Sequence, residues 1–205
     1  MGIQGCQFWN DRNVYFAQEN NPTEQILRAR LGGKGWLETC GPTAAVNCLA
    51  AMGELTPWTT PGGYSPQPEQ ELMDHMTDPR NWEKFRKAWG GEDPQVVPGN
   101  EVAQWYPVAI QEVLGTKCWF WGELALELAI KHVQAGRAIQ VCLKNPGHFV
   151  ALVAYDSDRG EFIINDSWSG RWPSGSGWNQ RLSKAEYDRN VKPKSLIYYQ
   201  RERAA

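Results

Sequence analysis

One segment, residues 40–53, constrains the fold of this chain more than any other. It reads Cys-Gly-Pro-Thr-Ala-Ala-Val-Asn-Cys-Leu-Ala-Ala-Met-Gly, so a thiol stands directly before Gly-Pro and an apolar, Ala-rich run follows. Proline is favoured in the first turn of a helix, where its missing N–H costs nothing, and glycine is favoured just past a helix end. The segment therefore predicts a helix of about three turns, with Cys40 at its N-terminus and Gly53 at its stop.

The predicted position of Cys40 has a chemical consequence. The first N–H groups of a helix lack intrahelical partners, and the positive end of the helix dipole lies beside them. Such surroundings favour the thiolate, which is the nucleophilic form of cysteine. A buried structural cysteine would not need this position, so Cys40 is the candidate nucleophile.

A nucleophilic thiol needs a base, and the chain contains three histidines. His75 lies in a polar helical stretch and is expected on the surface. His132 lies late in a predicted helix, where a cation near the C-terminus is a sufficient explanation. His148 follows Asn-Pro-Gly and opens the apolar run 149–155, a strand signal bounded by turn residues. A structural role would also suit a histidine there, but with Cys40 in the same chain we predict that His148 is the base.

A hairpin is expected to bring a third polar group to His148. The turn sequence Asp-Ser-Asp-Arg-Gly precedes a second strand at 161–166, whose end returns beside the start of the first strand. Asn165 and Asp166 lie there on opposite faces, because strand side chains alternate. One of the two orients the imidazole through its other nitrogen. We expect Asp166 in this role, although alone it would be interpreted as a turn residue, and we expect the Trp168 indole to shield the bond from water.

These residues resemble a known group. The order Cys, His, Asp or Asn, with the thiol opening a helix and the other two on a sheet, resembles papain-like cysteine peptidases. Three stretches are most similar to the C39-like branch, which contains bacteriocin-leader peptidases: Cys-Gly-Pro-Thr at 40–43, Gly-His-Phe-Val at 147–150 and Ile-Asn-Asp at 164–166. Asp166-Ser-Trp is also similar to the Asn-Ser-Trp of papain. The resemblance implies that Asp166 orients His148.

The resemblance also implies a fold and a reaction. The fold class is α+β and papain-like, in one domain spanning residues 1–205. A helical N-terminal lobe (about 1–136) carries the nucleophile helix, and an antiparallel β-sheet forms the C-terminal lobe (about 137–205). The implied reaction is hydrolysis of an amide bond by a Cys-His-Asp triad.

One position departs from the papain-like pattern. Those enzymes carry a Gln six residues before the thiol, where its amide helps to form the oxyanion hole, and here that position is Lys34. Either a loop rearrangement brings in another donor or Lys34 serves as a cationic one, and the Cys40 N–H contributes in both cases. Lys34, Trp36, Asn165 and Trp168 are the residues expected in the oxyanion hole or in contact with substrate.

The other elements are predicted from periodicity and capping signals. Besides the nucleophile helix, helices are expected at 67–76, 80–89, 101–114 (kinked or split at Pro107) and 123–135, with a short one after the capping box at 183–186. Strands are expected at 138–143, 148–155, 161–165 and 195–200. Residues 55–68 indicate a long loop.

Composition excludes several classes of function. With 41% apolar and 21% charged residues a full core is available, and a net charge of −2 with a pI near 6.0 argues against binding nucleic acid. No window approaches about 18 apolar residues, so no membrane span is expected. No charged leader with an apolar run opens the chain, which predicts synthesis in the cytoplasm without a signal peptide and release by lysis or a dedicated secretion system.

The cysteines predict neither a disulfide scaffold nor a metal site. They form an odd set of five without close pairs: Cys6, Cys40, Cys48, Cys118 and Cys142. No spacing suits zinc, so neither a metal nor a cofactor is expected. Cys48 is expected to pack on the nucleophile helix and Cys142 in a strand.

The substrate is the least constrained inference. Eleven tryptophans is a high count, and the aromatic loop 167–178 is expected to form one wall of a cleft for an extended ligand. A monomeric bacterial or phage peptidoglycan endopeptidase fits that wall and the absence of a signal. Two alternatives stay open: a secreted effector that cleaves or deamidates a protein, and an inactive peptide-binding protein that keeps the fold, as the missing Gln would allow.

Overall fold

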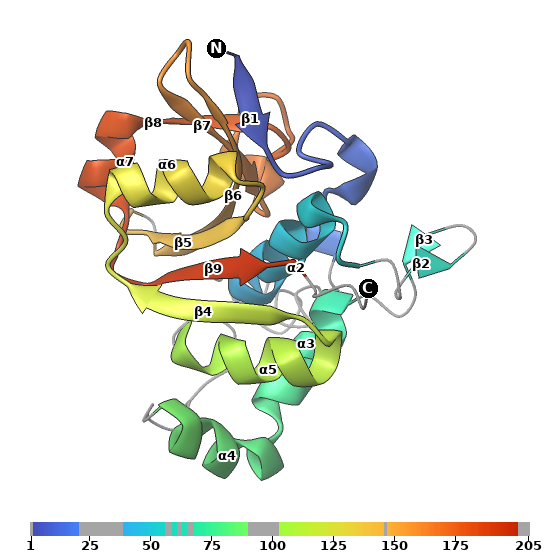
Figure 1. Cartoon of the computed structure of the whole chain (residues 1–205). Coiled ribbons are helices and arrows are strands. Elements are labelled where there is room, and N and C mark those ends of the chain that lie inside the picture. Colours follow the sequence, from blue (N-terminus) through green and yellow to red (C-terminus); the bar gives the residue numbers. More distant parts are fainter. Residues whose placement is uncertain are drawn as a thin grey trace, which may run out of the picture.

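The structure is a computed structural model that describes residues 2–20, 39–55, 59–60, 63–64, 68–89, 103–145 and 147–200. Its centre is a seven-stranded antiparallel sheet in the order β4-β9-β5-β6-β7-β8, with β1 paired to the far end of β6 (Figure 1). The strands are β1 Ile3–Gly5, β4 Lys117–Gly122, β5 Ile139–Leu143, β6 His148–Asp156, β7 Glu161–Asp166, β8 Gln180–Ser183 and β9 Ser195–Tyr199. A separate pair joins β2 Thr59–Thr60 to β3 Gly63–Tyr64.

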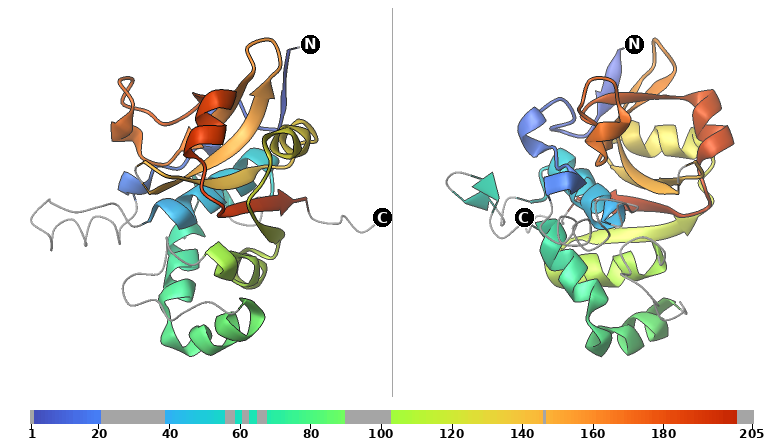
Figure 2. Two further views of the ribbon diagram at one scale, coloured as in Figure 1. Left: turned by 90° about the vertical axis from the view of Figure 1, so that its left-hand side faces the viewer. Right: turned by 180° about the vertical axis from the view of Figure 1, so that it is seen from behind.

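Helices lie on both faces of the sheet and beyond one edge. The α-helices are α2 Cys40–Met52, α3 Pro68–Thr77, α4 Pro79–Trp89, α5 Tyr106–Leu114, α6 Leu126–Gln134 and α7 Lys184–Asn190. The short 3-10 turns are η1 Arg12–Val14, η2 Gln18–Asn20, η4 Ala103–Trp105 and η5 Ser169–Arg171. Figure 2 shows α3, α4 and α5, drawn in green, gathered beyond the β4 edge of the sheet.

Helix α2 is the buried core element that its sequence predicts. It runs from Cys40 to Met52, every residue in it is buried, and Gly53 ends it in the left-handed conformation at φ 78°. The side chain of Asn47 fixes the N-terminal segment to this helix, because it accepts a hydrogen bond from the Phe16 N–H (2.8 Å) and donates one to the Phe16 carbonyl (2.9 Å).

Strand β6 separates two hydrophobic clusters. All nine of its residues are buried. Phe149, Ala151 and Val153 pack in the cluster that contains α2, whereas Val150 and Leu152 pack in the cluster that contains α6. This alternation is the period of a strand that is covered on both faces.

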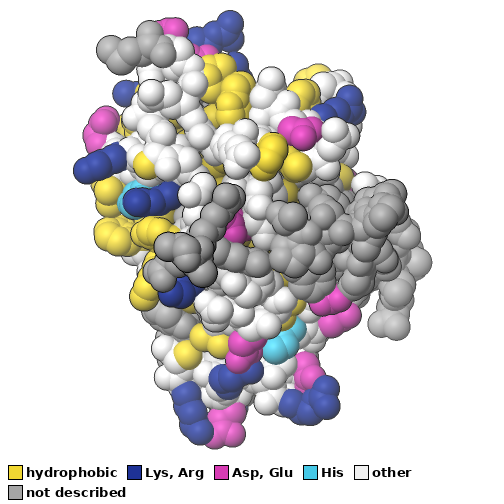
Figure 3. Space-filling view, turned by 45° about the vertical axis from the view of Figure 1, so that its right-hand side comes forward, with side chains coloured by type: hydrophobic (Ala, Val, Ile, Leu, Met, Phe, Trp, Pro, Cys, Tyr) yellow, Lys and Arg dark blue, Asp and Glu magenta, His cyan; other side chains and the backbone are white. Residues whose placement is uncertain are grey.

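The surface carries both signs of charge. On the face shown in Figure 3, Lys and Arg side chains are interspersed with Asp and Glu side chains. Within the described ranges, no helix is both long and apolar enough to cross a membrane.

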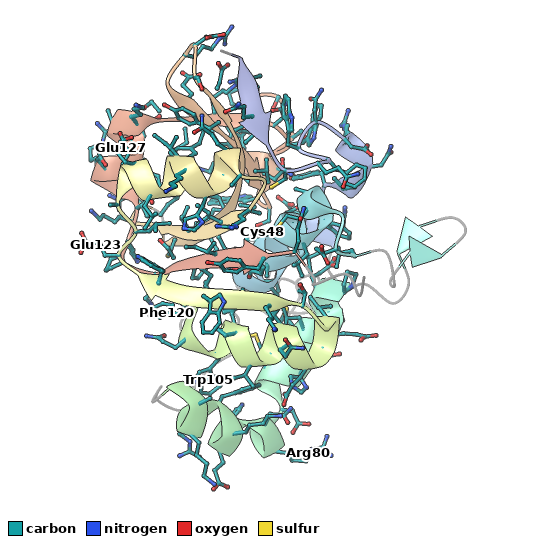
Figure 4. The ribbon with its side chains drawn as sticks, viewed as in Figure 1. Cys48, Arg80, Trp105, Phe120, Glu123 and Glu127 are labelled. Carbon is teal, nitrogen blue, oxygen red and sulfur yellow. The ribbon has the colours of Figure 1, made fainter. Side chains whose placement is uncertain are left out.

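Three expectations about the elements need correction. The region before residue 136 is not wholly helical, because β1 and β4 belong to the main sheet and β4 pairs with β9. Figure 4 shows the side chain of Phe120 on β4, which packs against the cluster that holds α2 and α5. Strand β8 was also not expected. The expected loop 55–68 contains β2 and β3. The helix expected at 101–114 is split near Pro107, as predicted: the 3-10 turn η4 is followed by α5, and Pro107 lies in the first turn of α5.

Candidate active site

His148 and Asp166 form a buried pair. His148 Nε2 lies 2.6 Å from Asp166 Oδ1, and the two residues are 3% and 0% exposed. The strand register explains the contact. Val150 on β6 lies opposite Asp166 on β7, and His148 is two residues away on the same face as Val150. The β6–β7 hairpin therefore brings the two side chains together as its sequence predicts.

The carboxylate of Asp166 receives hydrogen bonds on both oxygens. Oδ1 accepts from His148 and from the Trp168 N–H (2.9 Å). Oδ2 accepts from the Trp172 indole N–H (3.0 Å) and from Arg171 Nη1 (3.3 Å). A buried carboxylate with this set of donors is held in one orientation.

Cys40 contacts the same imidazole of His148 that contacts Asp166. It is the first residue of α2 and is buried. Burial alone would lower the pKa of His148, but hydrogen bonds to Asp166 and Cys40, together with their charges, outweigh that effect and raise the pKa of His148 to about 9. Because Asp166 occupies Nε2, Nδ1 is the ring nitrogen left for the thiol. The fold therefore favours the imidazolium form of His148 at neutral pH.

Trp168 covers the imidazole. Its ring lies edge-on to His148, with centroids 5.9 Å apart and an interplanar angle of 72°. The indole therefore lies where it limits access of water to the His148–Asp166 bond.

Three hydrogen bonds to backbone groups fix the loop that follows Asp166. The Tyr15 hydroxyl donates to the Asp166 carbonyl (2.8 Å) and accepts from the Gly177 N–H (3.2 Å). The Asp166 N–H in turn donates to the Gly177 carbonyl (2.9 Å). A Cβ on Gly177 would overlap the Asp166 carbonyl oxygen, so only glycine fits this close approach.

Gln18 is a candidate site residue that sequence reasoning missed. It is fully buried, its N–H donates to the Ser167 carbonyl (2.9 Å), and its Oε1 accepts from the Ser167 hydroxyl (2.7 Å). Its Nε2 has no hydrogen-bond partner among the described residues. Twenty-two residues separate Gln18 from Cys40, so the expected spacing of six did not find it.

The other predicted site residues lie in different places. Asn165 is buried on the opposite face of β7, where its Oδ1 accepts from the Asn179 N–H (3.2 Å). Lys34 and Trp36 lie outside the described residues.

The other two histidines contact groups other than Cys40 and Asp166. His75 lies 2.8 Å from Glu112, and His132 lies 3.2 Å from Arg137. Of the three histidines, His148 is thus the one that the fold places in contact with Cys40.

The remaining thiols are held in their protonated form. Burial raises the pKa of Cys6 to about 12 and also raises the pKa values of Cys48, Cys118 and Cys142. In the ranges that the structure describes, no group of three or more His, Cys, Asp or Glu side chains is arranged to hold a metal ion.

These elements define an α+β, papain-like fold, in which a thiol opens a buried helix beside an antiparallel sheet. The chain belongs to the Peptidase C39 like family, whose model matches residues 13–190. Membership of this family suggests a cysteine peptidase.

A solved structure described as a C39-like peptidase from Bacillus anthracis is 14% identical in sequence. The alignment covers 93% of this chain and 96% of that chain, with a TM-score of 0.47. Among curated proteins, none matches this chain.

Proposed function

We propose that the protein is a cysteine peptidase that hydrolyses an amide bond with Cys40, His148 and Asp166 as its triad. The observation that carries the proposal is the buried 2.6 Å contact between His148 and Asp166, together with the hydrogen bond between Cys40 and the same imidazole. The high pKa of His148 supports a thiolate–imidazolium pair, which is the reactive form of such a dyad.

The reaction proceeds in two halves. The Cys40 thiolate attacks the carbonyl carbon, and the imidazolium of His148 gives its proton to the leaving amine as the C–N bond breaks. An acyl-enzyme remains. His148 then takes a proton from water, the hydroxide attacks the thioester carbonyl, and the thiolate leaves as the carboxylic acid forms. Asp166 keeps the imidazole in the orientation and tautomer that both halves need.

Gln18 supplies the side-chain donor of the oxyanion hole in this proposal. Its amide oxygen is fixed by Ser167, the residue after Asp166, and its buried Nε2 has no partner in the described part of the chain. A buried amide donor costs free energy unless it finds an acceptor, and the oxyanion that forms during attack is such an acceptor. The Cys40 N–H is the second donor. This assignment replaces the need for a Gln at position 34.

Replacing Gln18 with alanine is expected to lower kcat by about 10²- to 10³-fold with little change in KM, because the lost bond forms only in the transition state. Steady-state kinetics on any cleaved peptide measure the effect. Ser167→Ala, which removes the bond that fixes the amide but keeps the amide itself, is expected to have a smaller effect. Gln134→Ala is the matched control, because that side chain bonds to Ser157 on the hairpin turn. Equal kcat for Gln18→Ala and wild type would remove Gln18 from the oxyanion hole.

The substrate that we propose is the peptide part of bacterial peptidoglycan. Support comes from the loop after Asp166, where Trp168 and Trp172 are partly exposed and lie against the triad. Aromatic side chains offer an extended ligand large contact areas at a low cost in side-chain entropy.

The test is release of new amino termini from purified cell walls, measured by mass spectrometry of the freed peptides. We expect release by the wild type and none by Cys40→Ala. Cleavage of casein without release of peptides from several wall types would contradict the peptidoglycan proposal. It would favour a general protein substrate, such as that of an effector protease. Absence of cleavage of either, with wild-type alkylation of Cys40 no faster than that of a buried thiol, would favour an inactive peptide-binding protein.

A further inference from the structure

Arg171 lies behind the proposed triad. It ends the 3-10 turn η5, five residues after Asp166, and its Nη1 lies 3.3 Å from Asp166 Oδ2, the oxygen that faces away from His148. The Arg171 side chain is 25% exposed, whereas the carboxylate is fully buried. The ion pair therefore links a buried group of the site to the surface.

Trp172 holds the guanidinium and the carboxylate together. Its indole N–H donates to the same Oδ2 at 3.0 Å, and the guanidinium of Arg171 lies 5.6 Å from its ring centroid. A cation in that position is attracted by the ring face. Arg171 is thus fixed by two contacts, one with the carboxylate and one with the ring.

Arg171 contributes a positive charge that offsets the net charge of Cys40, His148 and Asp166. With Cys40 as thiolate, His148 protonated and Asp166 ionised, the three groups carry one net negative charge. Within the described ranges, the guanidinium of Arg171 lies in direct contact with the carboxylate of this group. Other ionisable groups in the described part of the chain also lie nearby. The Tyr15 hydroxyl and Glu19 lie near the backbone of Asp166 and the η5 turn, and Cys142 with Lys192 and Lys194 lies near the start of β6. Tyr106 interacts with Cys40, and Glu186 interacts with Arg171.

We propose that Arg171 is a positioning residue that fixes the Asp166 carboxylate toward His148 and balances the charge of the thiolate–imidazolium–carboxylate group. This inference rests on the proposed function. Removing the guanidinium leaves a net negative charge in a buried site. The three groups then bind protons more tightly, and the reactive thiolate–imidazolium pair forms only at higher pH.

The rate of Cys40 alkylation by iodoacetamide as a function of pH tests this inference without a substrate. For Arg171→Met we expect the midpoint of the acid limb to rise by about half to one pH unit, which corresponds to a rate about 3- to 10-fold lower on the acid side. The rate on the alkaline plateau should stay unchanged. Arg171→Lys keeps the charge but loses the planar fork, so it should restore part of the shift. Peptide mapping follows Cys40 separately from the other four cysteines.

Arg159→Met is the matched control. Arg159 pairs with Asp156 at 4.0 Å, its side chain is 69% exposed, and it lies in the turn at the opposite end of the β6–β7 hairpin from Asp166. We expect no shift of the midpoint for this variant. Arg171→Gln is a second neutral variant, in case Arg171→Met unfolds.

The outcomes separate this inference from the proposed function. If Cys40 is alkylated in both neutral Arg171 variants with the same acid-limb midpoint as in the wild type, Arg171 is merely structural, even if the variants have a lowered Tm. A wild-type Cys40 that reacts no faster than a buried thiol would contradict the proposed function and remove this inference with it. A higher acid-limb midpoint in Arg171→Met, with a smaller increase in Arg171→Lys, supports both the role of Arg171 and the proposed function.

Discussion

Replacing His148 with alanine is expected to lower the turnover of an amide substrate by about 10⁴- to 10⁶-fold, because in the proposed mechanism this side chain both stabilises the thiolate and moves the proton to the leaving amine. The same variant should lose the selective alkylation of Cys40 at mildly acidic pH, since no imidazolium then stabilises the thiolate. Steady-state kinetics and peptide mapping after a short exposure to iodoacetamide measure the two effects.

His132→Ala is the control for this experiment. His132 lies in the last turn of α6, contacts Arg137 and Tyr199, and is one of the two histidines outside the site. We expect normal turnover and normal labelling for that variant. If His148→Ala keeps selective labelling of Cys40 and measurable turnover, another group acts as the base and the triad is wrong.

Replacing Asp166 with alanine is expected to lower turnover by about 10³- to 10⁴-fold, whereas Asn165→Ala should change it by only a few-fold. The alanine leaves the imidazole of His148 without its 2.6 Å acceptor, and it also leaves the Trp172 indole and Arg171 without their shared oxygen. The Asn165 side chain instead accepts a hydrogen bond from the Asn179 N–H on the other face of the strand.

A third variant makes this comparison sharper. Asp166→Asn keeps an oxygen that can accept from His148, so it should retain more activity than Asp166→Ala. Circular dichroism and the Tm show whether each variant is folded before its kinetics are compared. An inactive Asn165→Ala beside an active Asp166→Ala would mean that the face assignment on β7 is reversed.

Local signals predicted the parts of the site that are close in sequence. Gly-Pro after Cys40 and Gly53 at the far end fixed both ends of α2, because capping and stop preferences act within one turn. The β6–β7 hairpin was predictable for the same reason, since a tight turn sets the register that brings His148 to Asp166.

The missed parts depend on contacts between distant segments. Gln18 reaches the site through Ser167, 149 residues further along the chain, and no local pattern marks that bond. Strand β4 was missed because its only strand partner in the described sheet is β9, some 80 residues later. The short run Lys-Cys-Trp-Phe-Trp-Gly has strand-forming aromatic residues, but a strand forms there only when the partner is present.

The position of β9 has a consequence for how the protein is made. It is the last of the described strands, and it lies inside the sheet, with β4 on one side and β5 on the other. During synthesis the sheet therefore stays divided until residues 195–199 have left the ribosome. The long loops closed by β4–β9 and β1–β6 pairing give the topology a high contact order, which is typical of slow folding. The helix that begins at Cys40 is thus made well before β9 completes the sheet beside it.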